Sequence, residues 1–125
     1  MLIHSVASLL YFLLLIISIL FQLGLVLGMP WGELTMGGYS KGVLPMSKRV
    51  GAGISAIILI CFGLIIAVRI ELLESALLDY NRLYYIVLAY SGIGIIANAA
   101  TKSTKERNLW LPVLLVMTLC LVLLW

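Results

Sequence analysis

Charged side chains are scarce in this chain of 125 residues: 10% are Asp, Glu, Lys or Arg, whereas soluble domains carry about a quarter. Hydrophobic residues make up 64% of the chain and its mean hydropathy is +1.22, which excludes a soluble domain and indicates an integral membrane protein. His4 is the only histidine and has no Cys or acid at ligand spacing, so we expect no metal site and no cofactor.

No charged residue lies at the centre of any long apolar run. Such a residue usually marks a proton relay or an ion path, and small four-helix multidrug exporters rely on a buried glutamate in their first helix. Its lack disfavours proton-coupled antiport. No Ser–His–acid arrangement and no pair of haem ligands is visible either, which disfavours an enzyme.

Four charge-free apolar runs approach the length of about 20 residues that a spanning helix needs. They predict an all-α fold, a membrane-spanning four-helix bundle in which residues 1–125 form a single transmembrane domain. The first run has no basic residue before it and no small-residue cleavage site, so we expect a permanent helix and not a signal peptide. The expected helices cover about 3–28, 50–69, 82–100 and 109–125, with a loop over 29–49.

Residues 70–80 lie between the second and third expected helices. Leu73, Ala76, Leu77 and Tyr80 follow helical spacing with acids mostly on the other side. This pattern predicts either an extension of the second helix or a short interfacial helix.

Orientation follows from the basic residues, because Lys and Arg on short loops are retained in the cytoplasm. The first and third connections carry six of the eight: Lys41, Lys48, Arg49, Lys102, Lys105 and Arg107. We therefore expect both termini outside and loops 1 and 3 in the cytoplasm. Lys48, Arg49, Lys102, Lys105 and Arg107 are expected to contact lipid headgroups. The net charge of +3 then belongs to a basic membrane face, and we expect no nucleic acid as a partner.

The first connection is rich in glycine, since residues 28–53 hold seven of the 11 glycines. It is too long for an ordinary helix connection and too apolar for a disordered one, so we expect an ordered loop folded against the bundle. Its Glu33 has two interpretations. Functionally, Glu33 is a ligand for an ion, proton or cationic substrate, with Thr35 beside it. Structurally, it caps backbone amides or pairs with Lys41, Lys48, Arg49 or Lys102.

Three polar residues are expected at one depth. A rise of 1.5 Å per residue puts Gln22, Ser55 and Asn98 about 5–10 Å below the cytoplasmic helix ends. They predict a small ligand-binding pocket, covered by Glu33 and Thr35 of the loop. The alternative is that Gln22 and Asn98 form interhelical hydrogen bonds, which hold membrane helices together.

Gly24, Gly28 and Gly32 form two overlapping GxxxG spacings. Small residues at this spacing let a second helix approach closely in a membrane. They predict helix packing within the bundle or in a dimer, with ligand contact as the alternative.

The phrase PWGELTMGG at 30–38, Leu44-Pro45, and Lys105-Glu106-Arg107 resemble a group of small bacterial four-helix integral membrane proteins without a known activity. The resemblance spans most of the chain. It implies a bacterial inner-membrane protein and implies no catalytic residue.

Three functions stay open. The first is a non-catalytic binding or assembly role in the lipid bilayer, through a homo-oligomer, a membrane-protein partner or lipid. The second is a small transporter or channel subunit that uses the polar pocket. The third is a membrane-embedded enzyme acting on a lipid or quinone.

Overall fold

The chain is all α-helical in the part that the structure, a computed structural model, describes: residues 2–74 and 79–125. The elements are α1 (Leu2–Val26), α2 (Met46–Arg69), α3 (Tyr80–Ala100) and α4 (Thr104–Leu124), with the short 3₁₀ helices η1 (Gly32–Leu34) and η2 (Met36–Gly38) between α1 and α2. Each of the four long helices is long and apolar enough to cross a membrane. This confirms the all-α prediction and indicates an integral membrane protein.

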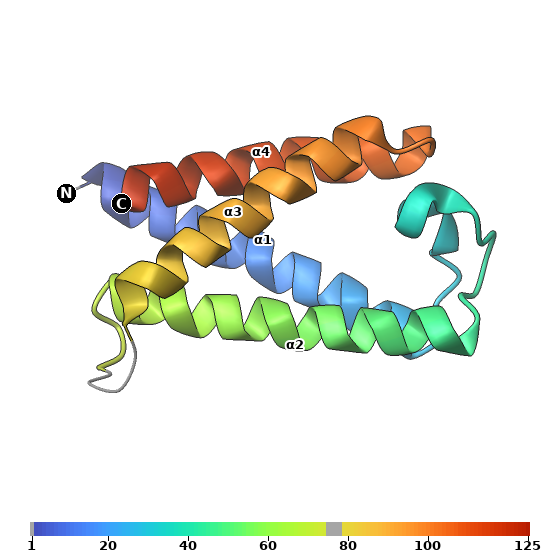
Figure 1. Cartoon of the computed structure of the whole chain (residues 1–125), viewed down its shortest axis with the longest axis horizontal. Helices are drawn as coiled ribbons and strands as arrows, with labels where there is room; N and C mark the ends of the chain where they lie inside the picture. Colours follow the sequence, from blue (N-terminus) through green and yellow to red (C-terminus); the bar gives the residue numbers. More distant parts are fainter. Residues whose placement is uncertain (1, 75–78) are drawn as a thin grey trace.

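The connections alternate between the two ends of the molecule. Figure 1 shows the N- and C-termini at one end and, at the other, residues 27–45, here called loop 1, together with the α3–α4 connection. α1 packs along both α2 and α4, and α3 packs along α4 and, over a shorter stretch, along α2. Loop 1 therefore lies beside the beginning of α4, which it contacts through η1 and η2.

The larger hydrophobic core lies among the four helices toward the termini. Its most buried side chains are Tyr11, Leu15, Ile66, Tyr84, Val87 and Leu121. The Tyr84 hydroxyl donates a hydrogen bond to the backbone oxygen of Leu121, so the polar end of this buried ring is satisfied. Because lipid offers no hydrophobic drive for helix association, close packing and such hydrogen bonds hold membrane helices together.

The first two helices differ from their predicted bounds at the loop 1 end. α1 ends at Val26 because Gly28 adopts a φ of 94°, a left-handed conformation that glycine takes without strain. α2 begins at Met46 and not at residue 50, directly after Pro45, whose extended backbone (φ −63°, ψ 158°) precedes the helix.

The last two helices begin earlier than predicted because capping residues start them. The Ser103 hydroxyl accepts a 3.2 Å hydrogen bond from the Glu106 amide, so α4 starts at Thr104 and not at residue 109. Asp79 accepts from the Arg82 amide at 3.3 Å in the same way before α3.

The predicted extension of the second helix is wrong, because α2 ends at Arg69 and Glu71 has a φ of 65°. A residue with this left-handed backbone does not continue a helix. Ala76 and Leu77, which belong to the predicted interfacial helix, lie outside the described residues.

Candidate functional site

Loop 1 is attached to the beginning of α4 by hydrogen bonds. The Ser103 hydroxyl donates to the backbone oxygen of Glu33 at 2.7 Å. The Gly37 amide donates to Oε2 of Glu106 at 2.9 Å, and the Thr101 hydroxyl donates to the same oxygen at 2.9 Å. Because hydrogen bonds to a carboxylate are stronger than those between neutral groups, Glu106 anchors η2 against α4.

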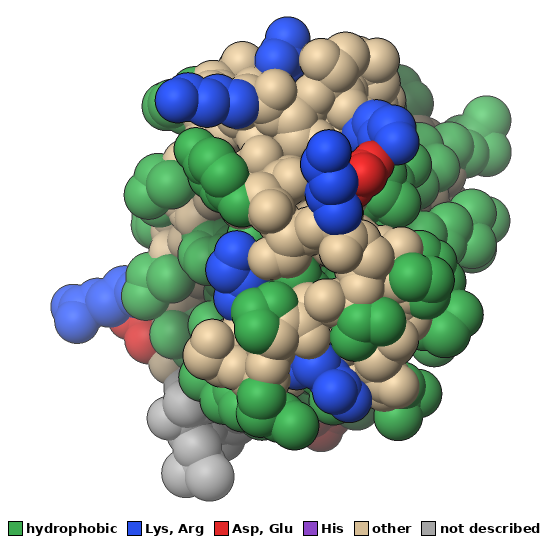
Figure 2. Space-filling model, turned by 90° about the vertical axis from the view of Figure 1, so that its right-hand side faces the viewer, with side chains coloured by type: hydrophobic (Ala, Val, Ile, Leu, Met, Phe, Trp, Pro, Cys, Tyr) green, Lys and Arg blue, Asp and Glu red, His purple; other side chains and the backbone are tan. Residues whose placement is uncertain are grey.

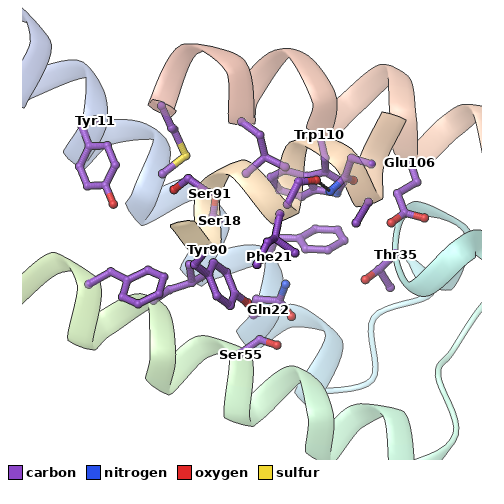
Figure 3. A pocket seen from close by; sticks show the side chains of 18 residues that line it. Tyr11, Ser18, Phe21, Gln22, Thr35, Ser55, Tyr90, Ser91, Glu106 and Trp110 are labelled. Carbon is purple, nitrogen blue, oxygen red and sulfur yellow. Dashed lines mark hydrogen bonds between the residues drawn. The ribbon is translucent and has the colours of Figure 1, made fainter. Parts of the chain in front are cut away.

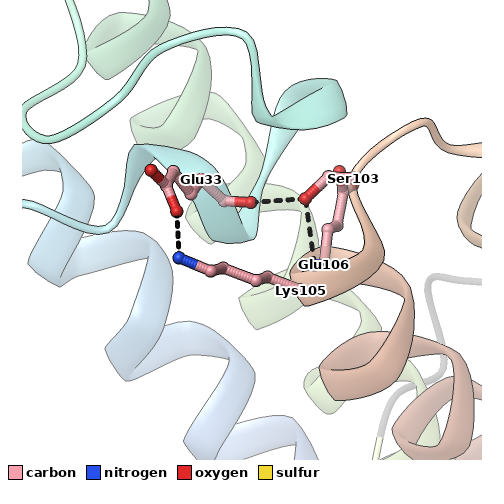
Figure 4. A network of polar contacts seen from close by, with 4 residues as sticks. All are labelled: Glu33, Ser103, Lys105 and Glu106. Atoms are coloured by element: carbon pink, nitrogen blue, oxygen red, sulfur yellow. Dashed lines mark hydrogen bonds and ion pairs between the residues drawn. The ribbon is translucent and has the colours of Figure 1, made fainter.

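The side chain of Glu33 lies at the surface of this contact and pairs with Lys105 (Figure 4). The two side chains are 34% and 69% exposed. The hydrogen bond from Lys105, and then its positive charge, lower the pKa of the Glu33 carboxyl below its ordinary value. Glu33 therefore forms an ion pair, as its structural interpretation predicts. Its partner is Lys105, which is not among the four cations predicted for that role.

Three aromatic rings link loop 1 to α1 and α4. The Trp31 ring stacks on Phe21 with centroids 5.6 Å apart, and Phe21 meets the Trp110 ring edge-on at 4.7 Å. The Trp110 indole then donates to the backbone oxygen of Leu34 at 2.9 Å. Such ring pairs contribute about 0.5–1.5 kcal/mol beyond area burial. Loop 1 is therefore bonded to α4 and stacked on α1.

The prediction that Gly24, Gly28 and Gly32 form one helix-packing stripe is wrong within this chain, because α1 ends before Gly28. A Cβ at Gly24 would lie 2.2 Å from the Trp31 ring, so Gly24 leaves space for this indole and not for a second helix. A Cβ at Gly32 would lie 2.0 Å from the backbone oxygen of Ser40. This glycine permits two parts of loop 1 to approach closely.

Two of the cations predicted to contact lipid headgroups donate hydrogen bonds to the protein backbone. Arg49 donates through Nε and a terminal nitrogen to the backbone oxygen of Val26, at 3.0 and 2.7 Å. Arg107 donates to the backbone oxygen of Thr101 at 2.8 Å. A cation at the C-terminal end of a helix is stabilised by the helix dipole and satisfies carbonyls left free there. Arg49 therefore caps α1, and both arginines are half-buried.

The lysines of this end lie nearer the surface. Lys102 and Lys105 are exposed, whereas Lys48 is half-buried and donates to the Ser40 hydroxyl at 2.9 Å. Figure 2 looks onto the loop 1 end and shows Lys and Arg side chains distributed across it. Headgroup contact by these lysines stays a prediction.

A cavity of about 370 Å³, here called the inter-helix cavity, lies among the helices beside loop 1 (Figure 3). Four of the five residues predicted to bind a ligand line it: Gln22 of α1, Thr35 of loop 1, Ser55 of α2 and Asn98 of α3. Glu33 does not line it, so its predicted place over the pocket is wrong. The carboxylate that lines the cavity belongs to Glu106.

Hydrogen bonding differs among the polar side chains of the cavity. Asn98 donates to the Gly94 oxygen of its own helix at 2.8 Å, so it makes no interhelical bond there. The Gln22 side-chain oxygen is buried without a hydrogen-bond partner in the described part of the chain. The alternative that both residues hold helices together is therefore wrong for these contacts. A buried acceptor left unpaired costs about 1–3 kcal/mol.

Glu106 and Trp110 were missed as site residues in the sequence analysis. A signal for Glu106 exists, since Ser103-x-x-Glu106 matches the Ser-x-x-Glu pattern of helix starts. That pattern predicts a helix boundary, but it does not predict that the carboxylate bonds loop 1, which lies far away in sequence. Trp110 carries no comparable signal, because an aromatic residue near a helix end is typical of the membrane interface.

No protein-family model, no curated protein and no solved structure matches the chain.

Proposed function

We propose that the protein is a small integral membrane protein with a non-catalytic binding role, and that the bound molecule occupies the inter-helix cavity. The cavity volume of about 370 Å³ falls within the range of about 300–1,000 Å³ that is common for ligand sites. The observation that carries the proposal is the buried Gln22 oxygen, for which residues 2–74 and 79–125 provide no hydrogen-bond partner. A ligand that donates a hydrogen bond removes the cost of this unpaired acceptor.

We further propose that the chain is a transmembrane four-helix bundle in a bacterial inner membrane, with both termini outside. Six basic residues at the loop 1 end of the helices support a cytoplasmic position for that end: Lys41, Lys48, Arg49, Lys102, Lys105 and Arg107. The hydrogen bonds and ring contacts from loop 1 to α1 and α4 support an ordered loop.

Native mass spectrometry of the protein, extracted gently from its own membrane, tests the binding role. Ser55 lines the cavity, so Ser55→Phe fills part of it. Ile57 of the same helix is 63% exposed and does not line the cavity, so Ile57→Phe is the matched control. We expect a molecule retained by the wild type and by Ile57→Phe and lost from Ser55→Phe.

The same spectra contain the outcomes that reject the proposal. A folded wild type that retains no molecule would remove the binding role. A molecule retained equally by Ser55→Phe would bind elsewhere. The spectra also record the oligomeric state, so an assembly role is seen directly as a ligand-free oligomer that Ser55→Phe leaves unchanged.

A transport role is the second candidate, and the position of Thr35 favours it. Thr35 of loop 1 lines the end of the cavity that faces the proposed cytoplasmic side. Loop 1 is held there by hydrogen bonds and ring contacts, which can break and re-form to open the cavity to that side. Vesicles reconstituted with the protein test this role. Wild type is expected to move the retained molecule across the bilayer faster than Ser55→Phe, and equal rates would reject transport.

A further inference from the structure

The inter-helix cavity opens along α3. Of the described residues that line it, only Tyr90, Ile93 and Ala97 are exposed, and all three belong to this helix. The rings of Phe62 and Tyr90 meet edge-on with centroids 5.0 Å apart, so α2 and α3 are in contact there. Figure 1 shows α2 and α3 diverging toward the loop 1 end of the molecule. Ser55 of α2 lines the cavity in this wider part. The mouth therefore lies between α2 and α3, on the loop 1 side of the ring pair.

In the proposed transmembrane position, this mouth faces the hydrocarbon of the bilayer. Both helices that border it are long and apolar enough to span the membrane, and Ile93 at its edge is 67% exposed. An exposed isoleucine within a spanning helix is in contact with lipid chains. A molecule that enters by this route comes from within the bilayer, so it carries a long apolar part.

The two ends of the cavity differ in their side chains. Gln22, Thr35, Ser55, Asn98 and Glu106 line its loop 1 end. The opposite end is lined by Tyr11, Phe62, Tyr90, Ser91 and Met117, whose polar groups are hydroxyls alone. The rise from Tyr11 to Gln22 along α1 is about 16 Å. The cavity volume of about 370 Å³ lies near the lower end of the range of about 300–1,000 Å³ that is common for ligand sites, which favours one chain over two.

The charges around the polar end select the head of the molecule. No Lys, Arg or His is among the described residues that line the cavity, and the one charged group is the Glu106 carboxylate. A buried anion without a cationic partner is strongly disfavoured, so phosphate and carboxylate heads are excluded. The unpaired Gln22 oxygen accepts a hydrogen bond and so favours a head that donates one.

We propose that the inter-helix cavity takes up, from the bilayer, a single-chain amphiphile whose head carries no negative charge and donates hydrogen bonds. The head lies beside Gln22, and the chain extends toward Phe62 and Met117. This inference rests on the proposed binding role of the same cavity and specifies the chemical class of its ligand.

Binding of matched amphiphiles to the protein in phosphatidylcholine nanodiscs tests this class. All three probes carry the same twelve-carbon acyl chain. The test ligand is 1-monolauroylglycerol, laurate at alkaline pH is the anionic control, and 1,2-dilauroylglycerol, with two such chains, is the two-chain control. We expect saturable binding of monolauroylglycerol at one molecule per chain, with both controls at least tenfold weaker. Loss of one hydrogen bond in Gln22→Leu should weaken binding about tenfold, since 1.4 kcal/mol is a factor of ten.

Two further variants keep the test decisive if Gln22→Leu fails to fold. Ser55→Phe fills the cavity, and Ala97→Phe blocks its mouth from an exposed position on α3. Both are expected to abolish binding, and Ile57→Phe is expected to leave it unchanged. Laurate or dilauroylglycerol binding as tightly as monolauroylglycerol would overturn the ligand class. A retained native molecule of another class that Ser55→Phe displaces would reject this inference and leave the binding role intact, whereas no cavity ligand at all would reject both.

Discussion

The indole nitrogen of Trp110 donates a 2.9 Å hydrogen bond to the backbone oxygen of Leu34. This bond joins the first turns of α4 to the end of η1, across most of the length of the sequence. The Trp110 side chain also lines the inter-helix cavity. One residue thus holds loop 1 in place and forms part of the wall beside it.

Trp110→Phe is expected to loosen loop 1 without disrupting the helices. Phenylalanine keeps an aromatic ring against Phe21 but loses the donor, and a neutral hydrogen bond contributes about 0.5–1.5 kcal/mol. Hydrogen exchange at the Gly37 amide, which is bonded to Glu106, should become about three- to tenfold faster.

Trp31→Phe is the matched control, because no hydrogen bond from the Trp31 indole is found in residues 2–74 and 79–125 while its ring stacks on Phe21. If Trp31→Phe accelerates exchange at Gly37 as much as Trp110→Phe does, ring packing and not the hydrogen bond holds the loop.

The pKa of Glu33 provides a pH-dependent test. Lys105 lowers it in the folded protein, so the pair stabilises the loop 1–α4 contact fully above the pKa of Glu33 in an unfolded chain. This stabilisation is lost as the pH falls through the lowered, folded value. Because both side chains are partly exposed, solvent screening keeps the effect small.

Carboxyl chemical shifts followed by NMR over an acid titration measure this pKa directly. Removal of the cation in Lys105→Gln is expected to raise the pKa of Glu33 toward its ordinary value. Lys102→Gln, at an exposed position on the same end, is the control and should change it less. A pKa that is the same in the wild type and in Lys105→Gln would show that the ion pair does not form.

Gly38 is expected to tolerate no side chain. Its φ is +72°, and an added Cβ would lie 2.6 Å from the Cβ of Ser103. Gly42 has a φ of +82° with nothing within 4 Å of an added Cβ. Alanine at either position costs about 1–2 kcal/mol for the left-handed backbone, but Gly38→Ala also separates loop 1 from α4.

Exchange at the Gly37 amide should therefore accelerate more in Gly38→Ala than in Gly42→Ala, because only the first change acts at the contact. Equal acceleration in the two variants would mean that backbone strain alone governs opening of the loop.

The four spanning-length helices follow from the apolar runs, but their ends do not. Counting apolar residues places the start of the last helix after Arg107, whereas α4 begins at Thr104. Charged residues in the first turn lie at the aqueous end of a spanning helix, where they cost little and where an acid is favoured by the helix dipole. Apolar composition indicates which residues lie within the membrane, but it does not indicate where the helix begins. The hydrogen bond from the Glu106 amide to the Ser103 hydroxyl sets the start of α4.

The candidate site shows the same division. Gln22, Ser55 and Asn98 were identified because polar residues stand out in apolar helices and the helical rise gives their depth, and these residues line one cavity. Glu33 was misplaced because its side chain points outward to Lys105 from η1. The direction of a side chain in an irregular loop depends on contacts such as the one with Ser103, which no local pattern predicts.

The proposed orientation predicts which cysteines a membrane-impermeant maleimide reaches in intact spheroplasts. Asp79 and Lys102 are both exposed and lie on opposite sides of α3 in the sequence. Because Lys and Arg on short loops are retained in the cytoplasm, Asp79→Cys should be labelled at once and Lys102→Cys only after lysis. The wild type, whose Cys61 and Cys120 lie within spanning helices, gives the background.

Labelling of Lys102→Cys before lysis would invert the orientation and place Glu106 and loop 1 outside. The mouth between α2 and α3 would still face lipid, so uptake of an amphiphile from the bilayer would survive, but transport toward the cytoplasm through loop 1 would not.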